Sequence, residues 1–289
     1  MKPDEYCQER AAASGSSFYY SFLFLPPEKR QAITALYAFC REVDDCVDEC
    51  SDPVIAGQKL DWWRSEIARV FHDQPQHPVG IALRTSLGHF QLNEAYFHAI
   101  IDGMLMDITQ HHYATFDELS LYCYRAAGVV GLLAAEIFGY KNAQTLDYAR
   151  HLGTAFQLTN IIRDVREDGQ RARVYLPAED LQRFNLSRED ILNAEQSANM
   201  RKMLHFQLQR AEGFYEQAFA CLPEEDRYTQ RSGIIMAAIY HRLLEQIKAR
   251  PLTVLQQRAS LSPLRKFWIA WKTNRNEKRR RQKFVRHNP

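Results

Sequence analysis

The sequence predicts an all-α fold in one large domain. Consecutive segments repeat apolar residues at a spacing near 3.6, and short runs of helix-breaking residues separate them. We find no alternating strand pattern bounded by hairpin turns, no βαβ unit and no GxGxxG motif. The chain has only 12 Gly and 11 Pro among 289 residues, which disfavours a loop-rich β architecture.

The first clear helix is predicted over residues 26–49, where prolines suit the first turn. Its apolar residues recur at Ile33, Leu36, Tyr37, Cys40 and Val43. Further helices are predicted over 54–73, 79–90, 93–110, 116–139, 143–168, 188–220 and 229–250. We therefore expect a single domain of about ten helices over residues 1–261, followed by a basic aromatic tail over 262–289.

Composition limits the class of protein. Hydrophobic residues make up 46% and charged residues 25%, a balance typical of globular proteins. The six cysteines form no CxxC pair and the chain opens with no apolar leader, so we expect reduced thiols in a cytoplasmic protein. The most apolar stretch, AAGVVGLLAAEIFGY, is interrupted by Glu136, and no run reaches the roughly 18 apolar residues of a membrane span. We expect no membrane-spanning helix.

Carboxylates are crowded at the end of the first predicted helix, in the stretch CREVDDCVDE. Asp44 and Asp48 are four residues apart and share one helix face, with Asp45 beside them. Like charges at this spacing cost roughly 0.2–0.5 kcal/mol per pair, which Arg41 can partly offset. Either this is a solvated acidic turn, or the carboxylates bind a cation.

A second stripe of oxygen ligands follows in FQLTNIIRDVREDGQRARVYLP. Gln157, Asn160, Asp164 and Asp168 follow one another at steps of three, four and four residues. Two helices that present such oxygens to one space suit Mg²⁺, which binds one or two carboxylates together with substrate phosphates. Three arginines nearby could bond phosphate oxygens directly, although a solvated face would explain them too: Arg163, Arg171 and Arg173.

These motifs, with YCYRAAGVVG between them, resemble the squalene and phytoene synthase family of head-to-head prenyl transferases. The similarity extends from about residue 14 to residue 250. Within the family, the stretch SGSSFYYSFLFLPPEKRQAITALYAFCREVDDCVDE is most similar to the bacterial presqualene diphosphate synthases of hopanoid biosynthesis. Phytoene synthases share the same motifs.

The resemblance implies a class I isoprenoid synthase fold, in which two farnesyl diphosphates occupy a central cavity. It implies that Mg²⁺, or Mn²⁺ in its place, is bound by Asp44, Asp48, Asn160, Asp164 and Asp168. Substrate contacts are implied for Ser14, Ser16, Ser17, Tyr37, Arg41, Gln157, Arg163 and Tyr240. Phe18 and Tyr124 are implied to line the reacting cavity, and Tyr124 joins the four aspartates as a catalytic residue.

Two departures from the family bear on the reaction. Arg125 follows Tyr124 where reductive eukaryotic squalene synthases carry another tyrosine, so NADPH is not expected as a cofactor. The C-terminal membrane anchor of those enzymes is also not expected here. The glycines of GVVGLLAAEIFG, Gly128 and Gly131, indicate either close helix packing or a widened tunnel for an isoprenoid tail.

The tail is strongly basic. From residue 265 to 289, ten Lys and Arg face one acid, Glu277, so this stretch carries +9 and the remainder −7 within a total of +2. Its apolar residues are Phe267, Trp268, Ile269 and Trp271. Such a segment suits an anionic membrane surface at the inner face of the cytoplasmic membrane. A solvated end is the alternative, and nucleic-acid binding is not expected.

The sequence thus predicts an Mg²⁺-dependent transferase that joins two farnesyl diphosphates head to head into presqualene diphosphate. Downstream enzymes of the same pathway are further expected partners. Within the fold, the alternatives are a phytoene or dehydrosqualene synthase and a full NADPH-dependent squalene synthase. An alternative from another class is a helical scaffold that binds membranes and has lost catalysis, although such a scaffold need not keep the second acidic motif intact.

Overall fold

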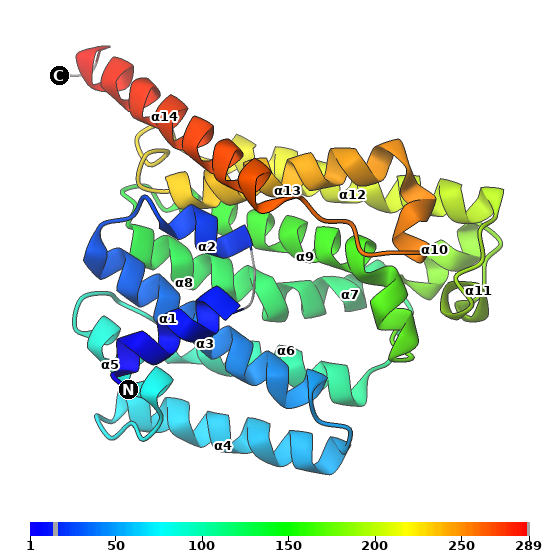
Figure 1. Ribbon diagram of the computed structural model, residues 1–289, viewed down its shortest axis with the longest axis horizontal. Helices are drawn as coiled ribbons and strands as arrows, with labels where there is room; N and C mark the ends of the chain where they lie inside the picture. Colours follow the sequence, from blue (N-terminus) through cyan, green and yellow to red (C-terminus); the bar gives the residue numbers. More distant parts are fainter. Residues whose placement is uncertain (14–16, 288–289) are drawn as a thin grey trace.

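The computed structural model describes residues 1–13 and 17–287, which are almost entirely helical (Figure 1). The N-terminal half contains α1 (Pro3–Ala13), α2 (Ser17–Phe22), α3 (Pro27–Asp48), α4 (Pro53–Phe71), α5 (Pro78–Leu87), α6 (Glu94–Thr109), α7 (Phe116–Cys123), the π-helical turn η1 (Tyr124–Gly128) and α8 (Val129–Phe138). The C-terminal half contains α9 (Gln144–Gln170), α10 (Ala178–Arg183), α11 (Arg188–Leu192), α12 (Ala198–Cys221), α13 (Arg231–Ala249), the 3₁₀ turn η2 (Pro251–Leu255) and α14 (Pro263–His287).

The predicted all-α class is confirmed. In the described ranges there is no β-sheet, only one isolated parallel bridge between His112 and Val174. The predicted bounds of α3 to α9 agree with the structure to within a few residues. All six cysteines are free thiols, as expected.

Two predicted helices are interrupted. The helix expected over 188–220 is divided into α11 and α12, because Ser197 caps a new helix by accepting the backbone N–H of Met200. Just before it, Ala194 adopts a positive φ of 52°. The helix expected over 116–139 contains the π-helical turn η1, which changes the rotational register of α8 relative to α7.

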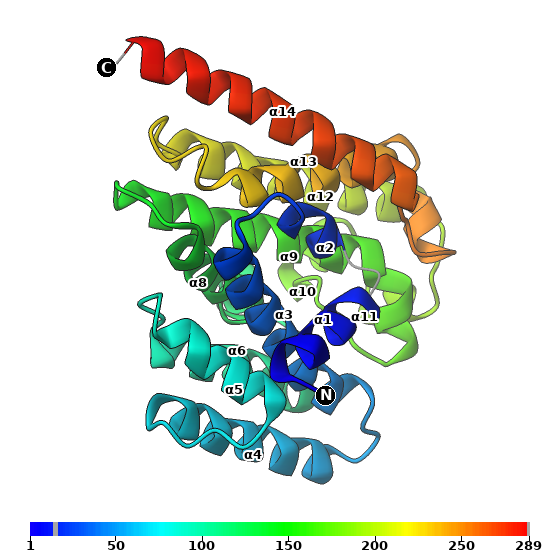
Figure 2. The same ribbon diagram turned by 60° about the vertical axis from the view of Figure 1, so that its left-hand side comes forward.

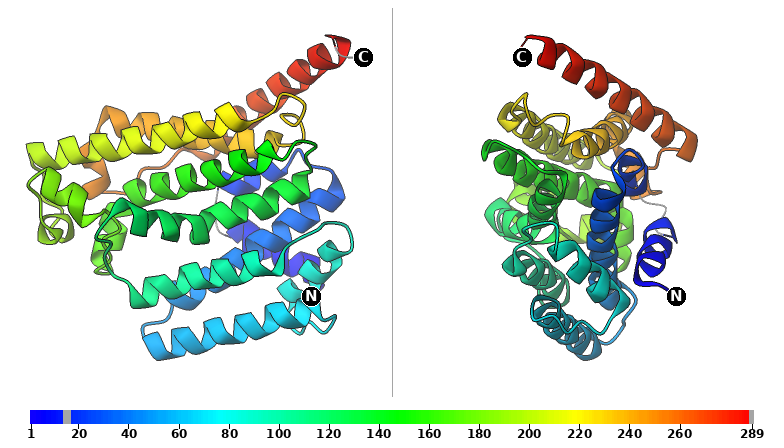
Figure 3. Two further views of the ribbon diagram at one scale, coloured as in Figure 1. Left: turned by 180° about the vertical axis from the view of Figure 1, so that it is seen from behind. Right: turned by 90° about the vertical axis from the view of Figure 1, so that its left-hand side faces the viewer.

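The helices form a layered bundle around α9. α9 lies between α12 and α8, and α3 packs against α1, α5 and α6 (Figures 2 and 3). One apolar cluster fills the space around α9, α12 and α13, and a second fills the space around α3, α4, α6 and α8. A cavity lies between these two clusters, and both halves of the chain contribute to its lining.

One stretch of the described chain, Phe116–Phe138, has the length and apolar composition of a membrane span. We expected no such stretch because of Glu136, but the mean hydropathy of an 18-residue window within this stretch is 1.4. Half of that window is buried inside the fold. Core helices pass the same test, so the finding is weak evidence for a membrane span.

The C-terminal segment expected as a tail is a long helix. α14 packs against α13 and α2 and crosses the top of the molecule in Figure 1, and its last turns extend beyond the bundle. It buries Ala270, Asn274 and Glu277 against its neighbours.

Glycines bring α8 and α9 into close contact. A Cβ added to Gly131 would lie 2.4 Å from the backbone oxygen of Ala149, and one added to Gly153 would lie 2.5 Å from that of Ala127. Gly131 therefore permits close helix packing, and both glycines also line the cavity between the two clusters. For Gly131, close helix packing and added room in the cavity are therefore compatible interpretations.

We predict that Gly131→Ala lowers the free energy of unfolding by about 1–3 kcal/mol, because the backbone contact with Ala149 leaves no room for a methyl group. Urea unfolding followed by circular dichroism measures the change. The matched control is Gly57→Ala in α4, where no atom lies within 4 Å of the added Cβ. The control should gain about 0.5–1 kcal/mol from helix propensity alone. Equal stability of the two variants would contradict the packing argument.

Candidate active site

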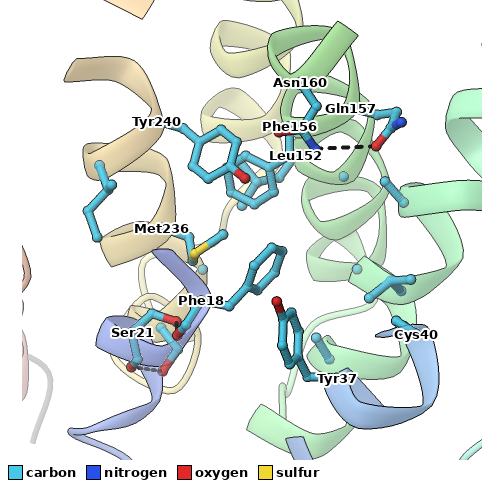
Figure 4. Close-up of a pocket in the computed structure, with 18 of the residues that line it drawn as sticks. Phe18, Ser21, Tyr37, Cys40, Leu152, Phe156, Gln157, Asn160, Met236 and Tyr240 are labelled. Carbon is cyan, nitrogen blue, oxygen red and sulfur yellow. Dashed lines mark hydrogen bonds between the residues drawn. The ribbon is translucent and has the colours of Figure 1, made fainter. Parts of the chain in front are cut away.

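A cavity of about 590 Å³ lies at the centre of the bundle. Its walls come from α2, α3, α8, α9, α13 and the segment that leads into α14. One end is polar, with Arg41, Asp44, Asn160 and Arg163, and the rest is mainly apolar and aromatic. Figure 4 shows several of the aromatic rings that line it, among them Phe18, Phe156 and Tyr240. A space of this form suits a molecule with an anionic head and a hydrocarbon tail.

The helix α3 presents one stripe of side chains to this cavity. Tyr37, Arg41 and Asp44 follow one another at helical spacing and line the wall. The opposite side of α3 is buried in the core through Ala35, Phe39 and Val43. Asp48 is the last residue of the helix and lies one turn beyond Asp44.

The helix α9 presents the second stripe. Gln157, Asn160 and Arg163 line the cavity, while Ile161, Ile162 and Val165 are buried. The Nδ2 of Asn160 donates a hydrogen bond to Oε1 of Gln157 at 3.4 Å (Figure 4). The Oδ1 of Asn160 is buried without a hydrogen-bond partner. An unpartnered buried carbonyl oxygen of this kind is costly and would be satisfied by a cation.

Ion pairs join the two acidic motifs. Asp48 accepts bonds from Arg171 at 2.8 Å and from Arg173 at 2.9 Å, and both arginines lie in the segment that follows α9. The end of α3 is thereby tied to the end of α9. A solvated turn was one of the two interpretations of the acidic stretch at the end of α3. In the structure, Asp48 of this stretch forms ion pairs with arginines that follow α9.

The remaining aspartates of the motifs have different partners. Asp44 pairs with Arg41, and Asp164 pairs with Arg163 and, at 2.9 Å, with Arg258. Asp45 also bonds Arg41, at 2.6 Å, but its second partner is Arg10 of α1. Asp45 therefore helps to dock α1 on α3.

Each acidic motif contains one carboxylate with a raised pKa, and Asp107 contributes to both shifts. Burial, together with Asp48 and Asp107, raises the pKa of Asp44 to about 7 against the effect of Arg41. Burial, followed by Asp164 and Asp107, raises the pKa of Asp168 to about 8. Raised pKa values of this kind mean that the ionised groups lack sufficient positive charge nearby. Because Asp107 acts on Asp44 and on Asp168, the two stripes lie near one common carboxylate.

The donors at this end fit a divalent metal such as Mg²⁺. They are carboxylate and amide oxygens, one of them the unpartnered Oδ1 of Asn160, and hard oxygens are what this ion prefers. Among the described residues, no three His, Cys, Asp or Glu side chains form a ready metal cluster. The aspartates bond arginines instead, and Mg²⁺ requires few protein ligands because it keeps waters and substrate phosphates. Asp44, Asp48, Asn160, Asp164 and Asp168 are the residues that would hold it.

Aromatic rings cross the cavity below the polar end. The ring of Phe18 lies 5.3 Å from that of Tyr37 and 6.5 Å from that of Phe156, measured between centroids. Phe156 in turn lies 4.8 Å from Tyr240 on α13 (Figure 4). These four rings come from four different helices and form a wall that can exclude water.

The structure brings most of the predicted site residues together. The cavity is lined by Phe18, Tyr37, Arg41, Asp44, Gln157, Asn160, Arg163 and Tyr240. Charge interactions and ion pairs place Asp48, Asp164, Asp168, Arg171 and Arg173 around the same polar end. Ser14 and Ser16 lie outside the described residues; Ser17 is the first residue of α2, and its side chain is likewise outside the description.

Tyr124 is not among the residues that line this cavity, and its expected catalytic role stays a prediction. Tyr122 and Ala126 of the same helical stretch line the cavity, whereas Tyr124 packs at the junction of the two core clusters. The cause is the π-helical turn that begins at Tyr124 and alters which residues face the cavity. Gly128 supports this packing, because a Cβ there would lie 3.1 Å from the Tyr124 ring.

Sequence reasoning missed three polar residues of the site. Arg258 lines the cavity and bonds Asp164, and Lys266 of α14 also lines it. Both follow residue 250, where the recognised similarity ended. The third is Asp107 of α6, which is 7% exposed and accepts bonds from the hydroxyls of Tyr122 at 3.1 Å and Tyr175 at 2.7 Å. No spacing in the sequence marks any of them.

The family model for squalene/phytoene synthases matches residues 11–265. The chain belongs to this family. A phytoene synthase of Arthrospira platensis is 36% identical over 271 residues, covering 88% of this chain and 87% of that protein. A 15-cis-phytoene synthase of Synechocystis is 36% identical over 282 residues, covering 92% of this chain and 84% of the relative.

Solved structures agree with this assignment. A dehydrosqualene synthase in complex with a ligand has a TM-score of 0.85 at 28% identity and covers 96% of each chain. The squalene synthase HpnC of Alicyclobacillus acidocaldarius has a TM-score of 0.77 at 26% identity, covering 86% of this chain and 94% of that one. The predicted family and isoprenoid synthase fold are confirmed. The chain is thus a transferase of the prenyltransferase type from a family that uses prenyl diphosphates and generally depends on a divalent metal.

We predict that Tyr175→Phe lowers the free energy of unfolding by about 1–3 kcal/mol at pH 8, because Asp107 loses the shorter of its two hydroxyl bonds. Burial raises the pKa of Asp107 to about 6. The ionised form therefore lowers stability as the pH rises from about 4 through 6, and losing a donor to that form increases the effect.

The difference in stability between Tyr175→Phe and the wild type should accordingly shrink at pH 5, where Asp107 is mostly protonated. Urea unfolding at several pH values measures it. A difference that stays constant with pH would show that the ionised carboxylate is not what the Tyr175 hydroxyl stabilises.

Proposed function

We propose that this enzyme condenses two farnesyl diphosphates head to head into presqualene diphosphate and releases one diphosphate. The observation that carries the proposal is one cavity with two oxygen-rich helical stripes and several arginines at one end and aromatic walls behind them. The proposed Mg²⁺, or Mn²⁺ in its place, neutralises the negative charge that develops on the leaving diphosphate.

The arginines at the polar end bind phosphate in this proposal. Arg41, Arg163 and Arg258 line the cavity and now bond the motif aspartates. Arg171 and Arg173 likewise form ion pairs with a motif aspartate, Asp48. Two oxygens of a phosphoryl group can accept a bidentate pair of hydrogen bonds from a guanidinium, as the two oxygens of a carboxylate do, so these guanidinium groups can move to a diphosphate without leaving the site.

The aromatic wall protects the carbocation. The bond between C1 and oxygen of the first farnesyl diphosphate breaks, and its electron pair leaves with the diphosphate. C1 then bonds to the double bond of the second farnesyl chain, and loss of a proton closes the cyclopropane. The released diphosphate accepts that proton, so no histidine is required, while Phe18, Tyr37 and Phe156 exclude water from the cation.

The depth of the cavity supports the fifteen-carbon substrate. Both Asn160 and Ala149 of α9 line it, and the eleven residue steps from one to the other span roughly 16 Å of helix. Three isoprene units in an extended form have about this length. Phe138 and Tyr148, both buried, line the cavity at the far end from the aspartates.

One observation favours a second candidate. The relatives named above are phytoene synthases, so condensation of two geranylgeranyl diphosphates is the alternative. Reduction by NADPH is not part of the proposal. The guanidinium of Arg125, at the position that raised this question, bonds the sulfur of Met106 at 3.5 Å. We further propose that the enzyme works in the cytoplasm and passes its product to downstream enzymes of the pathway.

Product analysis tests the proposal. We expect purified protein with Mg²⁺ to convert farnesyl diphosphate into presqualene diphosphate, identified by mass spectrometry, and to give the same product when NADPH is added. Geranylgeranyl diphosphate should react at a small fraction of that rate. Phytoene as the preferred product would assign the enzyme to the second candidate, and squalene formed only with NADPH would restore the reductive reaction.

Asp164→Asn should reduce turnover about a hundredfold or more, because it removes a charged ligand from the proposed metal site. A second readout is the thermal midpoint: Mg²⁺ with inorganic diphosphate should raise that of the wild type and not that of the variant. The matched control is Asp147→Asn, an exposed residue of the same helix that pairs with Arg150. Two results would remove Asp164 from the proposed site. One is an equal loss of turnover in Asp164→Asn and Asp147→Asn, and the other is an equal rise of both thermal midpoints with Mg²⁺ and diphosphate.

A further inference from the structure

The helix α14 has two different faces. Ala270, Asn274 and Glu277 are at most 7% exposed and pack on the bundle. On the outer face four large apolar residues occur within eight positions: Leu264, Phe267, Trp268 and Trp271 are 84%, 48%, 55% and 43% exposed. This cluster, called the aromatic patch below, is unusual because exposed apolar side chains normally occur singly.

The charges of α14 separate in the same way. Its one acid, Glu277, is buried and pairs with Arg227 at 3.0 Å, so it does not offset the cations outside. Several of its cations are exposed: Arg265, Lys272, Arg275, Lys278, Arg279 and Arg286. Two of them lie over the patch itself, Lys272 at 4.9 Å from the Trp268 ring and Arg275 at 5.3 Å from the Trp271 ring. The outer face therefore combines indole rings with cations that lie directly beside them.

The start of α14 also contributes to the wall of the cavity. Leu261, just before α14, and Lys266, in its first turn, both line that cavity. α2 packs against α14 and adds Tyr19, which is 45% exposed (Figure 2). Lys266 also lies 5.8 Å from the ring of Tyr20 on α2. The first turns of α14 therefore carry the aromatic patch and also supply a cation to the cavity wall.

We propose that the outer face of α14 binds an anionic lipid bilayer and holds the cavity, which the start of α14 lines, close to the membrane surface. Indole rings at headgroup depth with Lys and Arg beside them are typical of helices that lie in a lipid interface. The net charge of +9 on residues 265–289, against −7 on the remainder, orients this face toward a negative surface. If the proposed function holds, apolar products leave the cavity directly into lipid.

Lipid fits this face better than nucleic acid or a second copy of the chain. Phosphate backbones attract cations but give no reason for four exposed apolar side chains in two turns of helix. A second copy would bring a like-charged helix against this one, and close approach of two such faces costs free energy. The bilayer alone matches both the charge and the apolar character.

Vesicle binding tests the proposal without any substrate, so its result is independent of the condensation reaction. The full-length protein should sediment with vesicles enriched in phosphatidylglycerol and stay in solution with pure phosphatidylcholine. Arg275→Gln, Lys278→Gln and Arg279→Gln together should weaken binding by about fivefold per charge at low salt. The matched control neutralises three exposed cations elsewhere: Arg30→Gln, Lys59→Gln and Arg201→Gln.

Tryptophan fluorescence locates the contact. The chain has four tryptophans, two in the aromatic patch and two on α4, at the opposite side of the bundle (Figure 1). Brominated lipids should quench the emission of the wild type and of Trp62→Phe. The double variant Trp268→Phe, Trp271→Phe should lose that quenching. The double variant Trp268→Ser, Trp271→Ser should in addition lose at least tenfold in vesicle binding but keep its turnover with soluble substrate.

Three results would overturn the proposal. They are equal binding to neutral and anionic vesicles, retention on duplex DNA but not on vesicles, and a dimer in light scattering that dissociates when the two patch tryptophans are changed to serine. Vesicle binding that survives both sets of changes in α14 would place any lipid contact on another surface.

Discussion

The structure depends on how it compensates negative charge that is concentrated between α3 and α9. Asp44, Asp48, Asp164 and Asp168 repel one another in a partly buried space, and the cost appears in the raised pKa values of two of them. Arginines offset this cost by pairing across the gap, most directly where Asp48 meets Arg171 and Arg173. The same contact holds the ends of α3 and α9 together.

This arrangement explains why a stable fold can carry a site that is unfavourable by itself. Removing one member of such a network leaves the others with uncompensated charge. A divalent cation and a diphosphate would satisfy the same groups, with the cation on the oxygens and the phosphates on the arginines. The charge pattern of the protein is therefore complementary to its proposed substrate complex. Without that complex, the ion pairs between arginines and aspartates neutralise the same groups.

The apolar part of the cavity depends on a different constraint, the close approach of α8 to α9. Gly131 and Gly153 allow the two backbones to meet, and their missing side chains also leave room inside the cavity. Phe18, Phe156 and Tyr240 then form the wall near the charged end. Phe138 lines the cavity away from this end, and in the proposed function the side chains there limit the length of the substrate.

The sequence by itself determined the helices and the stripes of like chemistry on α3 and α9, because helical periodicity shows which residues share a face. Only the tertiary structure decided which faces meet. It brought Arg258 and Asp107 to the site from outside the motifs, and its π-helical turn placed Tyr122 rather than Tyr124 on the cavity wall. The physical reason is that contacts between distant segments depend on packing and on local helix register, and a single sequence pattern encodes neither.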